Sequence, residues 1–466
     1  MDAKLLKEKL LSQKHNGWTR VTPEEREAAM DFAAGYADFL GRAKTERETV
    51  TAAVELLEMN GFTPFDPDRS YHPGDRVYRN NRGKALIAAV IGSQPIEKGV
   101  RIAAAHGDSP RLDLKPHPLY ESEELAYFKT HYYGGIRKYQ WPTVPLSLHG
   151  VVVRSDGVTV SVNIGEEAGD PQFVVTDLLP HLGAEQNKRT LADGVRGEEL
   201  NILVGSRPFN EDEESQQVKL NVMHLLHEKY GITEDDFVSA ELEAVPAAKP
   251  VDIGLDRSML GGYGHDDRVC AYPALMAALD MGTPPKTVIT VLADKEEIGS
   301  EGNTGLNSSF LRYFVDDLAD CLGGQGRRVL SASECLSADV NAAYDPSFPD
   351  PFEKNNASFM NYGAVVTKYN GARGKYDSSD ASAEFVGRIR NLLDGHGVVW
   401  QSSEMGKVDF GGGGTVAKYL AALNVDVVDL GVPVLCMHAP FEVVSKLDVY
   451  MTYRAIHTFY SADENE

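Results

Sequence analysis

Two adjacent glutamates, Glu296 and Glu297, stand shortly after an apolar, β-branched run at residues 288–292. In an open α/β sheet, binding and catalytic groups collect beyond the carboxyl ends of the strands. Two neighbouring carboxylates there repel each other unless a cation or a proton separates their roles. One can then hold a metal ion while the other moves protons. An acidic turn in solvent is the competing interpretation, and the rest of the chain has to decide between the two.

Four further candidate ligands stand where strand-like or glycine-rich segments end. Three of them, His106, Asp339 and His438, each follow an apolar run. The fourth, Asp266, follows a glycine-rich approach. Each alone has an ordinary explanation, because a histidine after a strand is often a hydrogen-bonded core residue and an aspartate often caps a helix. Together with Glu297 they make five coincidences in one chain, which favour a shared site.

The charges of these five residues suit two divalent cations. Asp266, Glu297 and Asp339 supply three negative charges, and His106 and His438 bind metals as neutral imidazoles. Two divalent ions carry four positive charges, so the remaining charge favours a bridging hydroxide. The nitrogen and oxygen ligands suit zinc, with manganese or cobalt as alternatives. We therefore predict two Zn²⁺ ions per subunit.

This ligand set leaves Glu296 free to act as the general base. Asp108 lies two residues after His106 in an extended segment, so its side chain is expected on the same side of the chain. We predict that Asp108 orients the His106 imidazole, as carboxylates commonly do for metal-binding histidines.

The pattern of the chain predicts an α/β catalytic domain interrupted by a second domain. Thr22, Pro23 and Glu25 form a capping box with a proline in the first turn, and strand-like runs follow at 85–91 and 100–105. Residues 144–164 instead alternate apolar and polar positions around the hairpin turn Ser155-Asp156-Gly157. We predict a mixed sheet flanked by helices, formed by residues 1–113 and 247–466, and a β-rich insert at 114–246. The acidic stretch Glu211–Glu214 within the insert is predicted to be a solvated loop.

Composition agrees with an intracellular enzyme. The net charge is −23, which disfavours nucleic acid and anionic membranes as partners. The N-terminus lacks the apolar core of a secretory signal, and no apolar stretch approaches the length of a membrane span. The four cysteines show no metal-binding or disulfide spacing and read as reduced thiols. We predict a cytoplasmic location.

Several segments, taken together, resemble the aspartyl aminopeptidase / aminopeptidase I family of dinuclear zinc exopeptidases. They are His106–Leu112, Gly264–Arg268, Asp294–Ser300, Ser337–Asp339 and Met437-His438, in the expected order over nearly the whole chain. The resemblance implies that Asp266 bridges the two metals. It places His106 and Asp339 on one ion, and Glu297 and His438 on the other. It also implies that the insert builds a dimer and helps to assemble a dodecamer.

The resemblance extends to substrate-binding residues. The segment 365–370 looks like the family stretch whose lysine meets a side-chain carboxylate of the substrate, so Lys368 is predicted to select an acidic N-terminal residue. Arg373 and Lys375 are alternatives, and Tyr376 is predicted to contact the substrate. Gly413 lies in a four-glycine run that allows a peptide to approach the backbone closely, although a flexible turn is an equal alternative.

These expectations together predict a metal-dependent aminopeptidase that removes N-terminal residues, possibly acidic ones, from peptides with a free N-terminus. The bridging hydroxide would attack the scissile carbonyl, with Glu296 as the base. Another dinuclear amidohydrolase, acting on N-acyl amino acids, would use the same metals and base. A catalytically silent assembly or metal-binding protein is the third interpretation, and the spare carboxylate of Glu296 argues against it.

Overall fold

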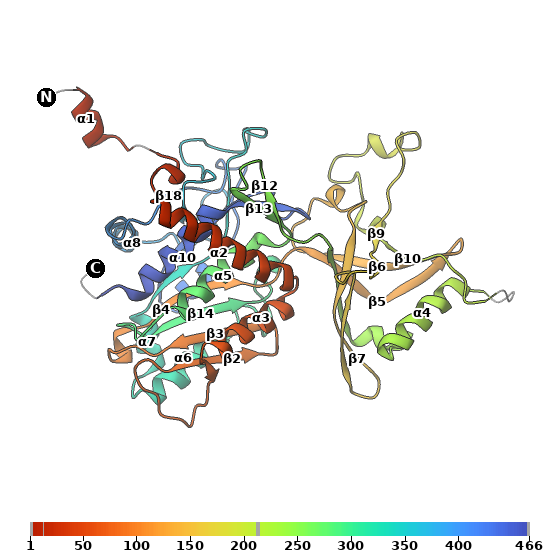
Figure 1. The fold of residues 1–466 in the computed structure, drawn as a ribbon, viewed down its shortest axis with the longest axis horizontal. Helices are drawn as coiled ribbons and strands as arrows, with labels where there is room; N and C mark the ends of the chain where they lie inside the picture. Colours follow the sequence, from red (N-terminus) through yellow and green to blue (C-terminus); the bar gives the residue numbers. More distant parts are fainter. Residues whose placement is uncertain (1–2, 13, 211–214, 464–466) are drawn as a thin grey trace.

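The computed structural model describes residues 3–12, 14–210 and 215–463, and in it two bodies lie side by side (Figure 1). The larger body contains both ends of the described chain, and helix α1 (Ala3–Leu10) extends away from it. The smaller body contains the middle of the sequence. The predicted solvated loop at Glu211–Glu214 lies outside the described residues.

The larger body is built on a mixed nine-stranded sheet, which confirms the predicted fold class. The strand order is β1 (Thr63–Pro64), β2 (Arg76–Asn81), β3 (Ala85–Val90), β14 (Val288–Ala293), β4 (Arg101–His106), β15 (Glu334–Ser337), β19 (Asp426–Gly431), β17 (Ala364–Thr367) and β18 (Trp400–Ser402). The four central strands, β14, β4, β15 and β19, are parallel to one another. Their carboxyl ends therefore meet at one edge of the sheet.

Helices cover both faces of this sheet. One face carries α2 (Pro23–Arg42), α3 (Glu46–Met59), α5 (His265–Leu279), α8 (Ala383–Gly395) and α10 (Lys446–Ser461). The other carries α6 (Phe310–Cys321), α7 (Gly326–Ser331) and α9 (Ala417–Ala421). Alternate residues of β3 and β4 enter the two separate cores, which explains why both strands read as continuous apolar runs.

The predicted capping box at the start of α2 is present, with Thr22 and Glu25 bonding each other's backbone. At α3, Thr45 accepts a bond from the Glu48 amide, but the Glu48 carboxylate turns to the Lys44 amide. That second capping motif is therefore only half formed.

The smaller body is a seven-stranded antiparallel sheet with its own hydrophobic core. The strand order is β8 (Thr159–Ile164), β7 (Leu146–Val153), β11 (Ala240–Pro246), β5 (Arg111–Ser122), β6 (Leu125–Tyr133), β10 (Ile202–Gly205) and β9 (Val174–Val175). Helix α4 (Gln217–Tyr230) packs on it. The hairpin expected at residues 155–157 joins β7 and β8. The sheet begins at Arg111, so the start of the insert chosen from the sequence, residue 114, falls inside β5.

A third, five-stranded sheet belongs to the larger body. Its order is β12 (Val251–Ile253), β13 (Met259–Gly262), β21 (Glu442–Ser445), β20 (Pro433–Leu435) and β16 (Asn341–Ala342). Short 3-10 turns are η1 (Gly17–Thr19), η2 (Ile96–Lys98), η3 (Lys138–Gln140), η4 (Gln186–Lys188), η5 (Gly197–Glu199), η6 (Glu234–Ser239) and η7 (Glu296–Ile298). Among the residues described, no helix has both the length and the apolar character that crossing a membrane requires.

Candidate metal centre

Three parallel strands deliver four of the predicted site residues to one edge of the nine-stranded sheet. His106 is the last residue of β4, and Asp339 follows β15. Glu296 and Glu297 open the turn η7, just beyond β14. These strands are adjacent and parallel, so residues far apart in the sequence come together, as the position of strand ends in such sheets predicts.

The third sheet supplies the other two. Asp266 lies at the start of α5, where its backbone is not yet helical, and His438 lies between β20 and β21. Glu442 of β21 ties both to the sheet. Its carboxylate accepts the Asp266 amide at 3.1 Å and the His438 amide at 2.7 Å. The two segments are therefore held in register with each other.

Asp266 stands between the two histidines. Its Oδ1 lies 3.3 Å from His106 Nε2, and its Oδ2 lies 3.0 Å from His438 Nε2. His438 Nε2 is also 3.4 Å from Glu297 Oε1. On the other side, His106 Nε2 is 4.0 Å from Asp339 Oδ1 and 3.8 Å from Glu296 Oε2. Five of these side chains, all but His438, fall in groups compact enough to hold a metal ion. His438 adjoins them through its contacts with Asp266 and Glu297.

Both histidines present an unprotonated nitrogen to this cluster when they are neutral. His106 Nδ1 donates to the Asp108 carbonyl at 3.0 Å, and His438 Nδ1 donates to the Gly135 carbonyl at 2.7 Å. Each Nε2 is then free to bind a metal ion. His106 Nε2 and Glu297 Oε1 are buried without a hydrogen-bond partner. Such atoms call for a partner, and imidazole and carboxylate are ligands that zinc accepts.

The acidic surroundings stabilise positive charge in the site. Burial lowers the pKa of His438, but its hydrogen bond to Asp266 and the Glu297 charge outweigh burial and raise that pKa to about 11. Burial raises the pKa of Glu296 to about 7, and it raises the pKa of Asp339 well above its usual value. Carboxylates crowded in this way are stabilised by bound cations, which return them to the charged form.

Asp108 lies under the cluster as its sequence position predicts. Besides the carbonyl contact, its Oδ1 is 3.3 Å from His106 Nδ1. Its two carboxylate oxygens also accept the backbone amides of Glu296 and Glu297, at 3.1 and 3.2 Å. Burial raises the pKa of Asp108, but hydrogen bonds from His106 and Tyr133 outweigh it, and the net shift is downward. Asp108 therefore stays charged and holds three segments of the site.

A cavity of about 490 Å³ opens over the cluster. Gly413 lies in its wall, as expected, with Asn370, Met405, Thr415 and Lys418. Lys418 approaches Asp377 of the same wall, at 3.4 Å.

The structure does not bring Lys368 or Tyr376 to this wall. Strand β17 ends at Thr367, and the exposed Lys368 lines a neighbouring cavity with Tyr369, Arg390 and Trp400. The Tyr376 side chain is 69% exposed. Lys368 was predicted to select acidic substrates and Tyr376 to contact them, and neither lines the cavity over the cluster.

A family model described as aminopeptidase I zinc metalloprotease (M18) matches residues 39–460. The chain belongs to this family. The M18 relatives include a probable M18 family aminopeptidase 1 from Clostridium acetobutylicum, 46% identical over 458 residues, which are 97% of this chain and 98% of the relative. The corresponding Thermotoga maritima protein is 45% identical, with 95% and 98% covered.

Solved M18 structures agree. An M18 aminopeptidase from Thermotoga maritima superposes with a TM-score of 0.92 at 43% identity, covering 97% of this chain and 99% of that one. Aminopeptidase I from Clostridium acetobutylicum gives 0.90 at 44% identity, with 97% and 100% covered. The Saccharomyces cerevisiae mApe1 dodecamer gives 0.74 at 21% identity, with 94% and 97% covered, and shares the fold.

These findings confirm the predicted family and enzyme class. The M18 chain is a metallo-aminopeptidase, a hydrolase, and its family is one of zinc metalloproteases. The alternatives of an N-acyl amino acid amidohydrolase and of a silent assembly protein are therefore set aside.

Sequence reasoning missed several residues around the M18 site. Glu442 interrupts an apolar run in the sequence shortly after His438, which was a readable signal. Asp267 accepts the His106 amide at 3.2 Å and was hidden by its neighbour Asp266. Tyr133 and Gly135 approach from the insert, and nothing in their local sequence pointed to the site.

Proposed function

We propose that this metallo-aminopeptidase holds two zinc ions, with Asp266 shared between them, His106 and Asp339 on one ion, and Glu297 and His438 on the other. The observation that carries the proposal is the position of Asp266, which turns one carboxylate oxygen toward each histidine. The unpartnered buried atoms of His106 and Glu297 support their role as ligands.

Glu296 is proposed as the general base rather than as a ligand, although it lies near His106 and Asp339 and could join them around an ion. The exposure of the two glutamates distinguishes them. Both residues line the cavity, but the Glu296 side chain is 17% exposed, whereas the Glu297 side chain is 3% exposed and lies against His438. A base has to reach the substrate and exchange protons, which favours Glu296.

The bound cations would supply Lewis-acid polarisation of the scissile carbonyl and a lowered pKa of coordinated water. The residues of the chain do the rest. Glu296 accepts a proton from the attacking water at its carboxylate and returns it to the nitrogen of the leaving amine. Asp108 holds the backbone of Glu296 and Glu297 in place while this happens. The cavity wall of Gly413 and its neighbours receives the peptide.

We further propose a preference for acidic N-terminal residues, with Lys418 as the residue that recognises the carboxylate. Lys418 is the one lysine or arginine among the described residues that line the cavity. Its contact with Asp377 is exposed and long, and such pairs are worth about 0.2–1 kcal/mol, so a substrate carboxylate can compete for it. Asp377 offers the opposite selectivity, for basic residues.

A substrate panel tests this function. Chromogenic Asp, Glu, Leu and Lys amides should be cleaved only without chelator, and N-acetylated analogues should not be cleaved. Lys418→Met should lower kcat/KM for Asp and Glu by about 10–150-fold, because it removes a hydrogen bond to a charged group. Lys368→Met, the matched control, should keep the wild-type ranking. Preference for leucine or lysine in the wild type would refute the acidic preference, and cleavage of acetylated substrates would refute the aminopeptidase.

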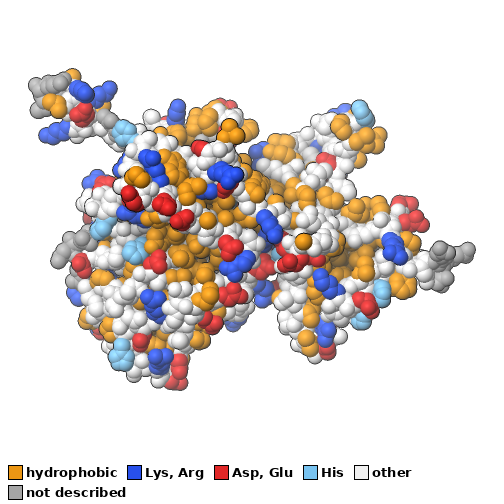
Figure 2. Space-filling model, viewed as in Figure 1, with side chains coloured by type: hydrophobic (Ala, Val, Ile, Leu, Met, Phe, Trp, Pro, Cys, Tyr) orange, Lys and Arg blue, Asp and Glu red, His pale blue; other side chains and the backbone are white. Residues whose placement is uncertain are grey.

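We also propose a homo-oligomer that assembles through the insert. Apolar side chains are exposed on the insert, among them Leu182, Leu191 and Leu225, and Figure 2 shows hydrophobic side chains on this body. An apolar cavity of about 420 Å³ adjoins Leu225 and is lined by Phe128, Leu148 and Phe173. Large exposed apolar patches mark interaction surfaces, and self-complementary ones give closed assemblies. A dimer-based dodecamer is the proposed form.

Light scattering at micromolar concentration should give a mass several times the 51.0 kDa of one chain. Leu225→Asp, at a side chain that is 60% exposed, should reduce that mass, since it places a charge on the proposed contact. Met59→Asp, at a 73% exposed side chain on α3 of the other body, should not. A wild-type monomer, or equal loss of mass in both variants, would contradict assembly through the insert.

A further inference from the structure

The insert reaches the metal centre through one short segment, residues 133–135 at the end of β6. The Tyr133 hydroxyl donates to Asp108 Oδ2 at 2.8 Å. Two residues later, the Gly135 carbonyl accepts the Nδ1–H of His438 at 2.7 Å. Other contacts between the insert and the larger body, such as Glu241 with Lys84 and His149 with Glu48, involve no residue of the proposed site. One segment of the smaller body therefore contacts both the carboxylate and the histidine that organise the site.

Asp108 connects Tyr133 to the turn η7, which carries Glu296 and Glu297. Its carboxylate is completely buried, and its two oxygens receive the amides of Glu296 and Glu297. The oxygen bonded by Tyr133 is the one that accepts the Glu297 amide. A hydroxyl that fixes the plane of this carboxylate therefore fixes the backbone from which both glutamates project.

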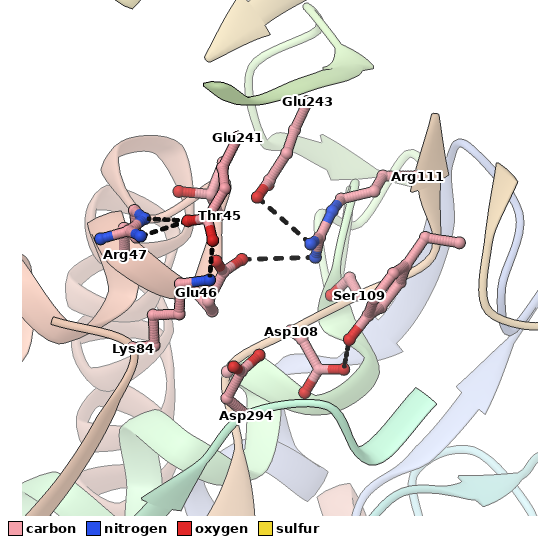
Figure 3. A network of polar contacts seen from close by, with 12 residues as sticks. Thr45, Glu46, Arg47, Lys84, Asp108, Ser109, Arg111, Glu241, Glu243 and Asp294 are labelled. Carbon is pink, nitrogen blue, oxygen red and sulfur yellow. Dashed lines mark hydrogen bonds and ion pairs between the residues drawn. The ribbon is translucent and has the colours of Figure 1, made fainter. Parts of the chain in front are cut away.

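Tyr133 is itself held at the junction between the two bodies. The Arg111 guanidinium lies 3.9 Å from the centre of its ring, a favourable cation–π contact. Arg111 is 3.2 Å from Glu243 of the insert and 3.3 Å from Glu46 of α3 in the larger body. In Figure 3 dashed lines join the Arg111 guanidinium to both glutamates. Burial favours a rigid geometry, since Arg111, Glu46 and Glu243 are all buried.

Gly134, between the two contacting residues, shows how close this approach is. Its backbone has φ +75°, in the left-handed region that favours glycine. A Cβ at this position would lie 3.3 Å from Glu297 Cβ and 3.3 Å from Glu297 Oε2. The backbone of the insert is therefore in near contact with a proposed metal ligand, and a side chain would push the two apart.

We propose that Tyr133 is a positioning residue for the reaction, supplied by the insert and acting through Asp108 on the turn that carries Glu296 and Glu297. The inference rests on the proposed function in one respect, namely that these glutamates serve as base and ligand. It gives the insert a role in the active site of its own chain, separate from any role in assembly.

The test compares Tyr133→Phe with Tyr132→Phe, a matched control at the exposed neighbouring tyrosine. Tyr133→Phe should lower kcat by about tenfold or more at little-changed KM, the effect expected when a hydrogen bond to a charged group is lost. In protein freed of metal, amide exchange should accelerate in residues 294–299 and stay unchanged in β7 and β11. Tyr132→Phe should match the wild type in both measurements.

A double variant separates positioning from general damage. If Tyr133 acts through Asp108, Asp108→Asn combined with Tyr133→Phe should lose no more activity than Asp108→Asn alone. Additive losses, faster exchange throughout the insert, or kcat within twofold of wild type would each overturn the proposal. A wild type without chelator-sensitive peptidase activity would refute the proposed function instead, and the exchange experiment would still decide whether Tyr133 orders the turn.

Discussion

Replacing Glu296 by glutamine should lower kcat by about 10²–10⁴-fold while metal content stays at the wild-type level. The substitution preserves size and the backbone amide that Asp108 accepts, but it removes the carboxylate that takes and returns the proton. Steady-state kinetics with a chromogenic substrate and elemental analysis of the same sample measure the two quantities. KM should change little, because the glutamine fills the same part of the cavity wall.

Two comparisons make this result decisive. Glu297→Gln should lose bound metal, since its carboxylate lies against His438 and carries an unpartnered buried oxygen. Glu301→Gln, on the exposed part of the same loop, should behave as wild type. If Glu296→Gln lost metal and Glu297→Gln kept it, the two glutamates would have to exchange roles.

Asp266→Asn should lose both metal ions and reduce activity to background. An amide is a weaker metal ligand than a carboxylate, and this carboxylate faces both histidines. Burial raises the pKa of Asp266, but the neighbouring His106 and His438 imidazoles outweigh burial and hold that pKa well below its usual value, so the carboxylate is charged. Adding zinc after chelation should restore the wild type and should not restore the variant.

Thermal unfolding gives an independent measure of the same prediction. A ligand that binds only the folded state raises the free energy of unfolding by RT ln(1 + [L]/Kd). Chelator should therefore lower the Tm of the wild type and leave the Tm of Asp266→Asn unchanged. An equal chelator-induced drop in both proteins would show that Asp266 is not required for binding.

Much of the fold could be read from the sequence because its signals are local. The strands β3 and β4 are buried on both faces, so their apolar runs are continuous and unambiguous. The capping box at Thr22 involves only four consecutive residues, so the sequence alone predicts the start of α2. Lys368 follows β17, which ends at Thr367, so strand alternation does not fix where its side chain lies.

Three of the proposed ligands, His106, Glu297 and Asp339, were readable because parallel strands bring their ends together whatever the length of chain between them. The supporting residues were not, because their contacts depend on how two sheets meet. Tyr133 is the last residue of β6 and Gly135 lies two residues beyond it. The alternation of an antiparallel strand predicts contacts within its own sheet only. The position of Lys418 could not be predicted either, because it depends on the glycine run before α9 forming part of the cavity wall.

The strand order also bears on how the chain is made. The central strand β4 lies between β14 and β15, both encoded beyond the insert, whereas β5 to β11 are contiguous in sequence. At about 5–20 residues per second, the ribosome needs roughly 10–40 s to pass from His106 to Val288. During that interval β4 has neither neighbour, and its apolar residues lack their final cover. The insert is synthesised whole in that interval and can fold first. Strand β4 then pairs with β14 and β15 next to an insert that is already folded.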